Sequence, residues 1–198
     1  MTSAAAIRTQ SVSEPIGALT VVGAPVSRAP TGSAPARSAP TSTALRTCLW
    51  FDTEGEEAVA FYTSIFKDSR IGRISRFSGA GPGRDGQAMT VEFELNGQRF
   101  VALNGAPHLY FNEAISFQIF CDDQADVDYY WNGLSKEGRQ GRCGWLQDRY
   151  GLSWQVIPRQ FVEMISDPDP GRAKRVADAM LKMKKLDIAA LQHAYEGE

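Results

Sequence analysis

Apolar residues recur at helical spacing in two stretches of the chain, and each stretch follows a short apolar run. Residues at positions i, i+3, i+4 and i+7 share one face of a helix, so each stretch predicts an amphipathic helix packed on a core. The runs before them, at 47–51 and 115–120, are typical of strands. The two apolar stripes are Ala58, Phe61, Tyr62 and Ile65, and Val127, Tyr130, Trp131 and Leu134.

The second stretch repeats the first at a constant offset of 69 residues. Phe51 in the first strand corresponds to Phe120 in the second, and every residue of the first stripe corresponds to one of the second. A single amphipathic helix carries little information about the fold. Two strand–helix units in one register predict an internal duplication.

Further strands are expected after each helix. The alternation of apolar and polar residues over 89–95 is typical of a half-buried strand, and the following Asn96-Gly97 favours a type I′ hairpin turn. The other expected strands are 71–77 and 99–103 in the first half, and 141–146 and 153–157 in the second. The sequence thus predicts an α+β fold, with two tandem βαβββ modules forming a cupped mixed sheet and helices at the C-terminus.

Polar residues mark the starts of the two repeated helices. Thr53 and Glu56 have the spacing of a capping box. Asp122 or Asp123 is a suitable N-cap for the second helix, because a short carboxylate accepts from the first free amides.

The C-terminal stretch 159–198 is also predicted to be helical. Asp169 is a suitable cap, Pro170 fits the first helical position, and Asp187 begins a short last helix. The apolar stripe here consists of Ala173, Val176, Met180 and Met183.

Residues 1–45 differ from the rest of the chain in composition. They hold 10 Ala, 7 Ser, 6 Thr and 5 Pro and no aromatic residue. Such a segment has too little apolar surface to offset its ordering entropy, so we expect a disordered leader. A targeting segment, a linker and an overextended gene start remain alternatives. The expected folded domain is 46–198, with modules at 46–107 and 112–158 and the helical extension at 159–198.

Composition excludes several classes of protein. The chain has 198 residues, of which 43% are hydrophobic, and a net charge of −2. Nucleic-acid-binding domains usually carry a strongly basic face, and a membrane span needs about 18 consecutive apolar residues, so we expect neither a nucleic-acid nor a membrane partner. Three cysteines, an odd number, imply no complete disulfide framework, and we expect a cytoplasmic protein.

The glycine-rich stretch 78–87 (SGAGPGRDGQ) is open to two interpretations. A phosphate-binding loop places its last glycine at the start of a helix. Here a strand is expected to follow, and Pro82 removes one amide donor. We therefore interpret the stretch as a hairpin loop.

The duplicated module and several stretches of sequence resemble the PhnB-like branch of the vicinal oxygen chelate superfamily, which includes glyoxalases and bleomycin-resistance proteins. The resemblance implies a cupped sheet that binds a small molecule, a divalent metal held by His or Glu, and a homodimer. This branch is often labelled a demethylubiquinone methyltransferase, but the chain shows no glycine-rich loop of the kind that cradles S-adenosylmethionine. The stretches that carry the resemblance are 48–72, 89–105, 113–131, 143–158 and 167–192.

The resemblance places the family's metal ligands, to within about one residue, at Thr47, Val101, Ser116 and Gln155. These residues are a poor set for a divalent ion, which prefers carboxylate, His or Cys ligands. We therefore expect no metal and no other cofactor. A divalent metal bound by an unusual ligand set remains the alternative.

Several residues are candidates for contacts with the ligand. Glu92 and His108 are the candidates for acid–base work, since a carboxylate buried in the cup would have a raised pKa; a solvated strand face and a surface loop are the alternatives. Cys48 is a candidate contact or a small apolar filler. An apolar pocket or ordinary core packing explains Trp50, Phe100, Trp145 and Trp154 equally well. The candidate ligand-binding residues are Cys48, Trp50, Glu92, Asn104, His108, Ser116, Trp154 and Gln155.

Two functions follow from these residues. The favoured hypothesis is a protein that binds a small molecule in its aromatic-lined cup without a metal. The alternative is a metal-dependent lyase, isomerase or dioxygenase.

Overall fold

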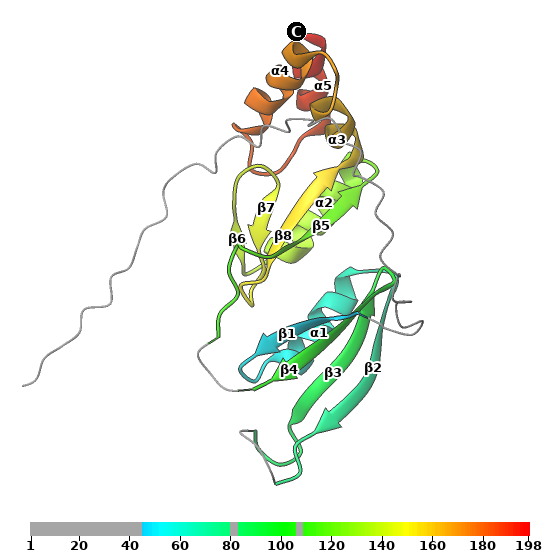
Figure 1. The fold of residues 1–198 in the computed structure, drawn as a ribbon, viewed down its shortest axis with the longest axis vertical. Coiled ribbons are helices and arrows are strands. Elements are labelled where there is room, and N and C mark those ends of the chain that lie inside the picture. The colour runs from blue at the N-terminus through cyan, green and yellow to red at the C-terminus, as the bar shows by residue number, and fades with distance from the viewer. Residues whose placement is uncertain (1–44, 80–82, 106–108) are drawn as a thin grey trace, which may run out of the picture. The chain divides into compact units, whose positions relative to one another are not determined.

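A computed structural model describes residues 45–79, 83–105 and 109–198, and residues Ala44–Glu198 form one compact unit. The expectation of a disordered leader and the candidate residue His108 lie outside the described residues. Two four-stranded sheets, each with a helix packed on one face, are followed by three C-terminal helices (Figure 1). None of the helices in the described part is long and apolar enough to span a membrane.

The first module has strand order β1-β4-β3-β2, and the second has order β5-β8-β7-β6. In each module the first and last strands pair in parallel and the other pairs are antiparallel, so both modules are mixed βαβββ units as predicted. The first module consists of β1 (Thr47–Phe51), α1 (Gly55–Ile65), β2 (Ser69–Arg76), β3 (Ala88–Leu95) and β4 (Gln98–Asn104). The second consists of β5 (Ser116–Cys121), α2 (Gln124–Ser135), β6 (Arg139–Gln140), β7 (Trp145–Gln147) and β8 (Ser153–Pro158).

The hairpin between β3 and β4 turns at the predicted dipeptide. Asn96 and Gly97 both have positive φ, at 47° and 79°, as a type I′ turn requires. The glycine-rich stretch joins β2 to β3, which pair antiparallel, so it is a connection within a hairpin and not the entrance to a helix.

The predicted offset of 69 residues is confirmed for the helices and wrong for the strands. The two helices begin at Gly55 and Gln124, 69 residues apart. In the strands, Trp50 and Phe120 are both exposed, whereas Phe51 is buried. The structural equivalent of Trp50 is therefore Phe120, because one residue fewer separates the strand from the helix in the second module.

The predicted strand 141–146 is also wrong over residues 141–144, and only Trp145 and Leu146 of that span lie in a strand. Two short strands, β6 and β7, flank a tight turn in which Cys143 and Gly144 have positive φ, at 57° and 82°. The Gly141 amide donates to the Trp145 carbonyl and closes this turn. Extended pairing cannot continue through left-handed residues.

The second module's helix and the C-terminal helices begin where the sequence predicts. Asp123 accepts from the Asp126 amide at the start of α2. Asp169 caps α4 (Pro170–Met180), and Asp187 caps α5 (Ile188–Glu196). The predicted stripe on α4 is too long by one turn, because Met183 lies beyond the helix end.

The capping box predicted for the first helix is wrong. Glu54 occupies the N-cap position of α1, and the Gly55 amide donates instead to Oδ1 of Asn104, at 2.8 Å, from the end of β4. A side chain distant in sequence thus satisfies one of the free amides at the helix start.

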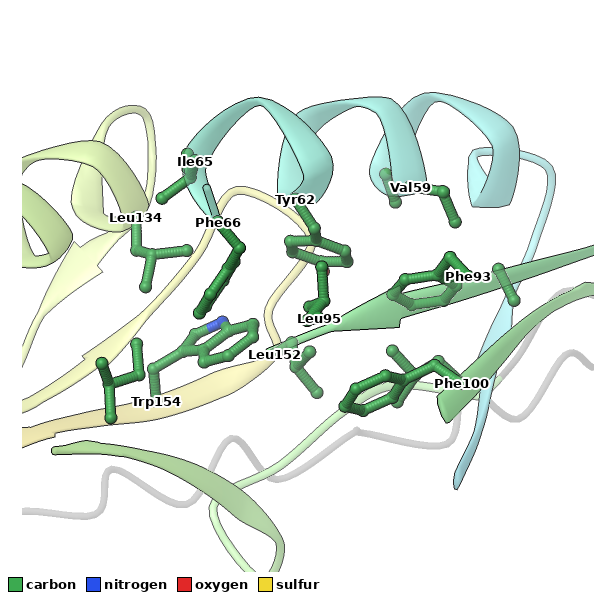
Figure 2. Packing of buried hydrophobic residues seen from close by; sticks show 14 of the residues in the cluster. Val59, Tyr62, Ile65, Phe66, Phe93, Leu95, Phe100, Leu134, Leu152 and Trp154 are labelled. Carbon is green, nitrogen blue, oxygen red and sulfur yellow. The ribbon is translucent and has the colours of Figure 1, made fainter. Parts of the chain in front are cut away.

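One apolar core joins the two modules. Figure 2 shows Val59 and Tyr62 of α1 pointing toward Phe93 of β3, with Trp154 of β8 next to Phe66. The C-terminal helices, including α3 (Arg159–Ile165), enclose a small core of their own. Its buried residues are Met164, Val176, Leu186 and Leu191.

Candidate functional site

An open hollow of about 900 Å³ lies where the second module's edge strand β5 meets the first module. Because β5 is an edge strand, side chains from both of its faces reach this hollow. The lining combines an apolar side with an amide-rich side. The lining includes Phe66, Phe100, Ser116, Phe117, Gln118, Tyr130, Trp154, Gln155 and Arg159.

The polar side of the hollow is a chain of hydrogen bonds across β5 and β8. Nε2 of Gln155 donates to Oγ of Ser116 at 2.7 Å, and Nε2 of Gln118 donates to Oε1 of Gln155 at 3.2 Å. Gln118 and Gln155 are register partners, so their side chains project from one face. These bonds fix the orientation of the Gln155 amide.

The apolar side of the hollow consists of aromatic rings in mutual contact. The ring of Phe117 lies 5.3 Å from that of Phe100 and 5.5 Å from that of Trp154, and Phe66 lies 5.5 Å from Trp154. Such offset and edge contacts stabilise aromatic clusters beyond simple area burial. Phe100 and Trp154 belong to this cluster, whereas the other aromatic candidates, Trp50 and Trp145, do not line the hollow.

The four positions implied for a metal do not provide a ligand set. Val101 pairs with Cys48 and with Glu92, so it faces the side of the first sheet away from α1. Thr47 precedes Cys48 and points to the opposite face. Ser116 and Gln155 bond to each other. Within 45–79, 83–105 and 109–198, no three His, Cys, Asp or Glu side chains gather closely enough to hold a metal ion.

For Glu92 the structure favours the solvated strand face over the buried base with a raised pKa. Its carboxylate oxygen Oε1 lies 2.9 Å from Arg73 and 3.0 Å from Arg46. Hydrogen bonds from Arg73 and Arg46 lower the pKa of Glu92. A carboxylate with two guanidinium partners is a weak proton acceptor.

Two other candidates are engaged in structural hydrogen bonds. Asn104 is buried, accepts from Gly55 and donates to the Ala88 carbonyl at 2.9 Å. Nε1 of Trp154 donates to Oδ2 of Asp148 at 2.8 Å inside the core, so only part of its ring reaches the hollow. Whether either residue contacts a ligand stays a prediction.

Cys48 and Trp50 lie on β1, on the face away from the core. Cys48 is exposed, which corrects its interpretation as a buried filler. Trp50 is 37% exposed, and its ring lies over Gly105: a Cβ added there would come within 2.3 Å of the indole.

Several lining residues were not among the sequence candidates. Gln118 follows Ser116 by two positions and shares its face, a signal that alternation along the strand supplies. Arg159 packs over the exposed ring of Phe120, 5.6 Å from its centre. No periodicity indicated that contact, because the two residues come from different elements.

Comparison with known proteins places the fold in a family. The sequence model of the 3-demethylubiquinone-9 3-methyltransferase family matches residues 43–157. The chain belongs to this family. The match ends at residue 157, within β8, so the predicted resemblance over 167–192 lies outside it.

Solved structures agree with this assignment. A PhnB protein from Bacillus cereus is 34% identical, and the alignment covers 59% of this chain and 99% of that one, with a TM-score of 0.55. A protein from Pseudomonas aeruginosa is 18% identical over 59% of this chain and 98% of its own, with a TM-score of 0.50, and so supports the fold alone. The comparison with curated proteins found no match.

The family's name refers to methyl transfer. The described residues include no glycine-rich strand-to-helix loop that could bind S-adenosylmethionine. Both strand-to-helix joins are short and acidic, at 52–54 and 122–123. The one glycine at these helix starts, Gly55, lies against Asn104, where an added Cβ would come within 2.6 Å of Oδ1. A glycine-rich loop that approaches S-adenosylmethionine requires free space instead.

Proposed function

We propose that the protein binds a small molecule with an apolar part and a polar group in the hollow around β5, without a metal ion. The observation that carries this proposal is the pairing of an aromatic wall with an oriented amide. Pockets for small molecules are mostly apolar, with a few fixed polar groups that orient the ligand. Gln155 is such a group, because Ser116 and Gln118 hold its amide.

The lining supports binding better than acid–base catalysis. An amide neither accepts nor releases a proton near neutral pH. The charged side chains that line the hollow are Asp122, Asp126 and Arg159, of which Arg159 and Asp122 pair with each other at 2.8 Å. The residues present therefore select a ligand by shape and hydrogen bonding.

Two further features belong to the proposal. We infer that the protein acts in the cytoplasm, since all three cysteines carry free thiols and a reducing compartment preserves them. We also infer a homodimer, because Trp50 and Phe120 are large exposed aromatic residues at equivalent places in the two modules.

Titration with the neutral fluorescent probe N-phenyl-1-naphthylamine tests the hollow. We expect saturable binding that Phe117→Ala weakens at least about tenfold, because loss of an aromatic contact costs about 1.5 kcal/mol. Phe61→Ala is the matched control: Phe61 is also a partly buried ring packed on the core, and it does not line the hollow. Equal losses in both variants would contradict the proposed site.

The metal-free part has its own test. Calorimetric titration with Mn²⁺, Ni²⁺, Zn²⁺ and Fe²⁺ should give no stoichiometric binding. One metal ion per chain, bound by the wild type and not by Gln155→Ala, would instead favour the metal-dependent lyase, isomerase or dioxygenase. Gln147→Ala on the neighbouring strand β7 is the matched control.

A further inference from the structure

The face of the first sheet away from α1 carries two adjacent groups of charged residues. Each consists of a glutamate of β3 between two arginines. Glu92 pairs with Arg46 and Arg73, and its neighbour on that face, Glu94, pairs with Arg70 and Arg99. We call these two groups the arginine–glutamate triads.

Each triad carries a net charge of +1, because it has two arginines and one glutamate. Two guanidinium groups share a single carboxylate oxygen in both triads, at Oε1 of Glu92 and at Oε2 of Glu94. Each guanidinium has five N–H donors, so its ion pair leaves several donors for another acceptor. The six side chains together carry a net charge of +2.

The two kinds of charge lie at different depths. The side chains of Glu92 and Glu94 are 29% and 23% exposed, whereas each of the four arginine side chains is 49% or more exposed. An approaching anion therefore meets guanidinium groups before it meets the carboxylates. Lysine would offer only a point charge, whereas the planar guanidinium matches a carboxylate or phosphate with two parallel bonds.

Every triad side chain except that of Arg73 lines a second hollow of about 540 Å³, which shares Phe100 with the one around β5. The uncharged residues that line it are Leu45, Ile71, Gly72, Phe93 and Phe100. Gly72 lies against Glu92, where an added Cβ would come within 3.2 Å of the backbone carbonyl. The site thus combines arginines with an apolar part that suits an organic chain.

We propose that this face binds an organic dianion whose two acidic groups are bridged by a short apolar chain, with one group at each triad. Residues two apart on a strand project from the same face about 7 Å apart. Glu92 and Glu94 therefore set the spacing of the triads. A dicarboxylate of matching length places one carboxylate at each triad, whereas a shorter dicarboxylate reaches a single triad.

Calorimetric titration with adipate and malonate tests the proposal. Both carry two carboxylates, but only the four methylene groups of adipate separate them by a comparable distance. We expect adipate to bind at least about tenfold more tightly than malonate. Its binding should weaken as salt rises, since these exposed charges are screened.

Variants that remove one charge locate the site. Arg73→Gln and Arg99→Gln each neutralise one triad, so each should reduce adipate affinity to about that of malonate. Arg76→Gln is the matched control, because Arg76 lies on β2 as Arg73 does but pairs one-to-one with Glu56. Adipate that binds no more tightly than malonate, or an equal loss in Arg76→Gln, would overturn the proposal. The neutral probe used for the hollow around β5 should bind all three variants unchanged.

Discussion

Asp148 is a buried carboxylate that holds together the turn before β8. Its Oδ1 accepts from the amides of Tyr150 and Leu152, at 2.8 and 3.1 Å, and its Oδ2 accepts from the Trp154 indole. Burial raises the pKa of Asp148, although its hydrogen bonds, from Trp154 first, act to lower it. The folded state therefore holds this proton more tightly than the unfolded state does.

We expect Asp148→Asn to lower the free energy of unfolding by about 1–3 kcal/mol, because an amide NH₂ faces the indole N–H in place of an acceptor. Since its folded pKa is raised, Asp148 contributes most below its unfolded value of about 3.9, and this contribution is lost as pH rises through the folded value. Urea unfolding between pH 3 and 7 measures the difference between wild type and variant. That difference should shrink as pH rises, and growth with pH would contradict the assignment.

Glu92 shows where reasoning from single residues in a sequence stops. Alternation along 89–95 correctly placed it on the face away from the core. Of its two partners, Arg46 immediately precedes β1 and Arg73 lies on β2. Periodicity predicts which face a side chain occupies, but not which charges from other strands approach it.

Among the elements, α1 depends on a residue 49 positions away. Asn104 at the end of β4 accepts from the Gly55 amide and donates to the Ala88 carbonyl, so one side chain joins α1, β3 and β4. Thr53 and Glu56 have the sequence spacing of a capping box, but the buried side-chain amide of Asn104 accepts from the helix start instead. Sequence spacing carries no information on such a long-range cap.

We expect Asn104→Ala to lower the free energy of unfolding by about 2 kcal/mol, because it leaves a buried helix amide and a strand carbonyl unpaired. Asn104→Asp keeps the acceptor for Gly55 and loses only the donor to Ala88, so its effect should be smaller. Urea denaturation followed by circular dichroism compares the two variants. Equal losses would show that the cap on α1 contributes nothing.

The strands of the second module deviated from prediction for a related reason. The first module has long strands whose alternation is visible in the sequence, and its β1 has the predicted bounds. In the second module, left-handed residues at Cys143 and Gly144 interrupt the predicted strand. Cysteine is not a typical turn residue, so the local sequence did not predict this interruption of the strand at Cys143.

For the whole molecule, duplication made the architecture predictable but not the site. The repeat of strand, helix and apolar stripe follows from burial, which both modules share. The hollow around β5 and the arginine–glutamate triads depend on residues that the duplication does not repeat. At offsets of 69 and 70 residues, Arg46 of the triads corresponds to the uncharged Ile115 and Ser116, and Gln118 of the hollow corresponds to Leu49 and Cys48.

The open faces of the two sheets lead to the last prediction, which concerns assembly. Trp50 of β1 and Phe120 of β5 are 37% and 44% exposed, each just before a buried residue at the end of its strand. Large apolar side chains exposed at equivalent places are typical of surfaces that another chain covers. A second copy is the occupant that we propose, since a two-fold interface buries the same patch on both chains.

Light scattering of the eluting protein measures this assembly directly. We expect a mass twice the 21.7 kDa of the chain, and we expect Trp50→Ser to shift it toward a single chain, because each copy would lose a buried aromatic contact. Leu181→Ser is the matched control: Leu181 is 38% exposed but lies in the C-terminal extension, so its variant should remain dimeric. A wild-type protein that elutes as a single chain at all concentrations would contradict the dimer. The two ligand sites are tested independently, by their own titrations.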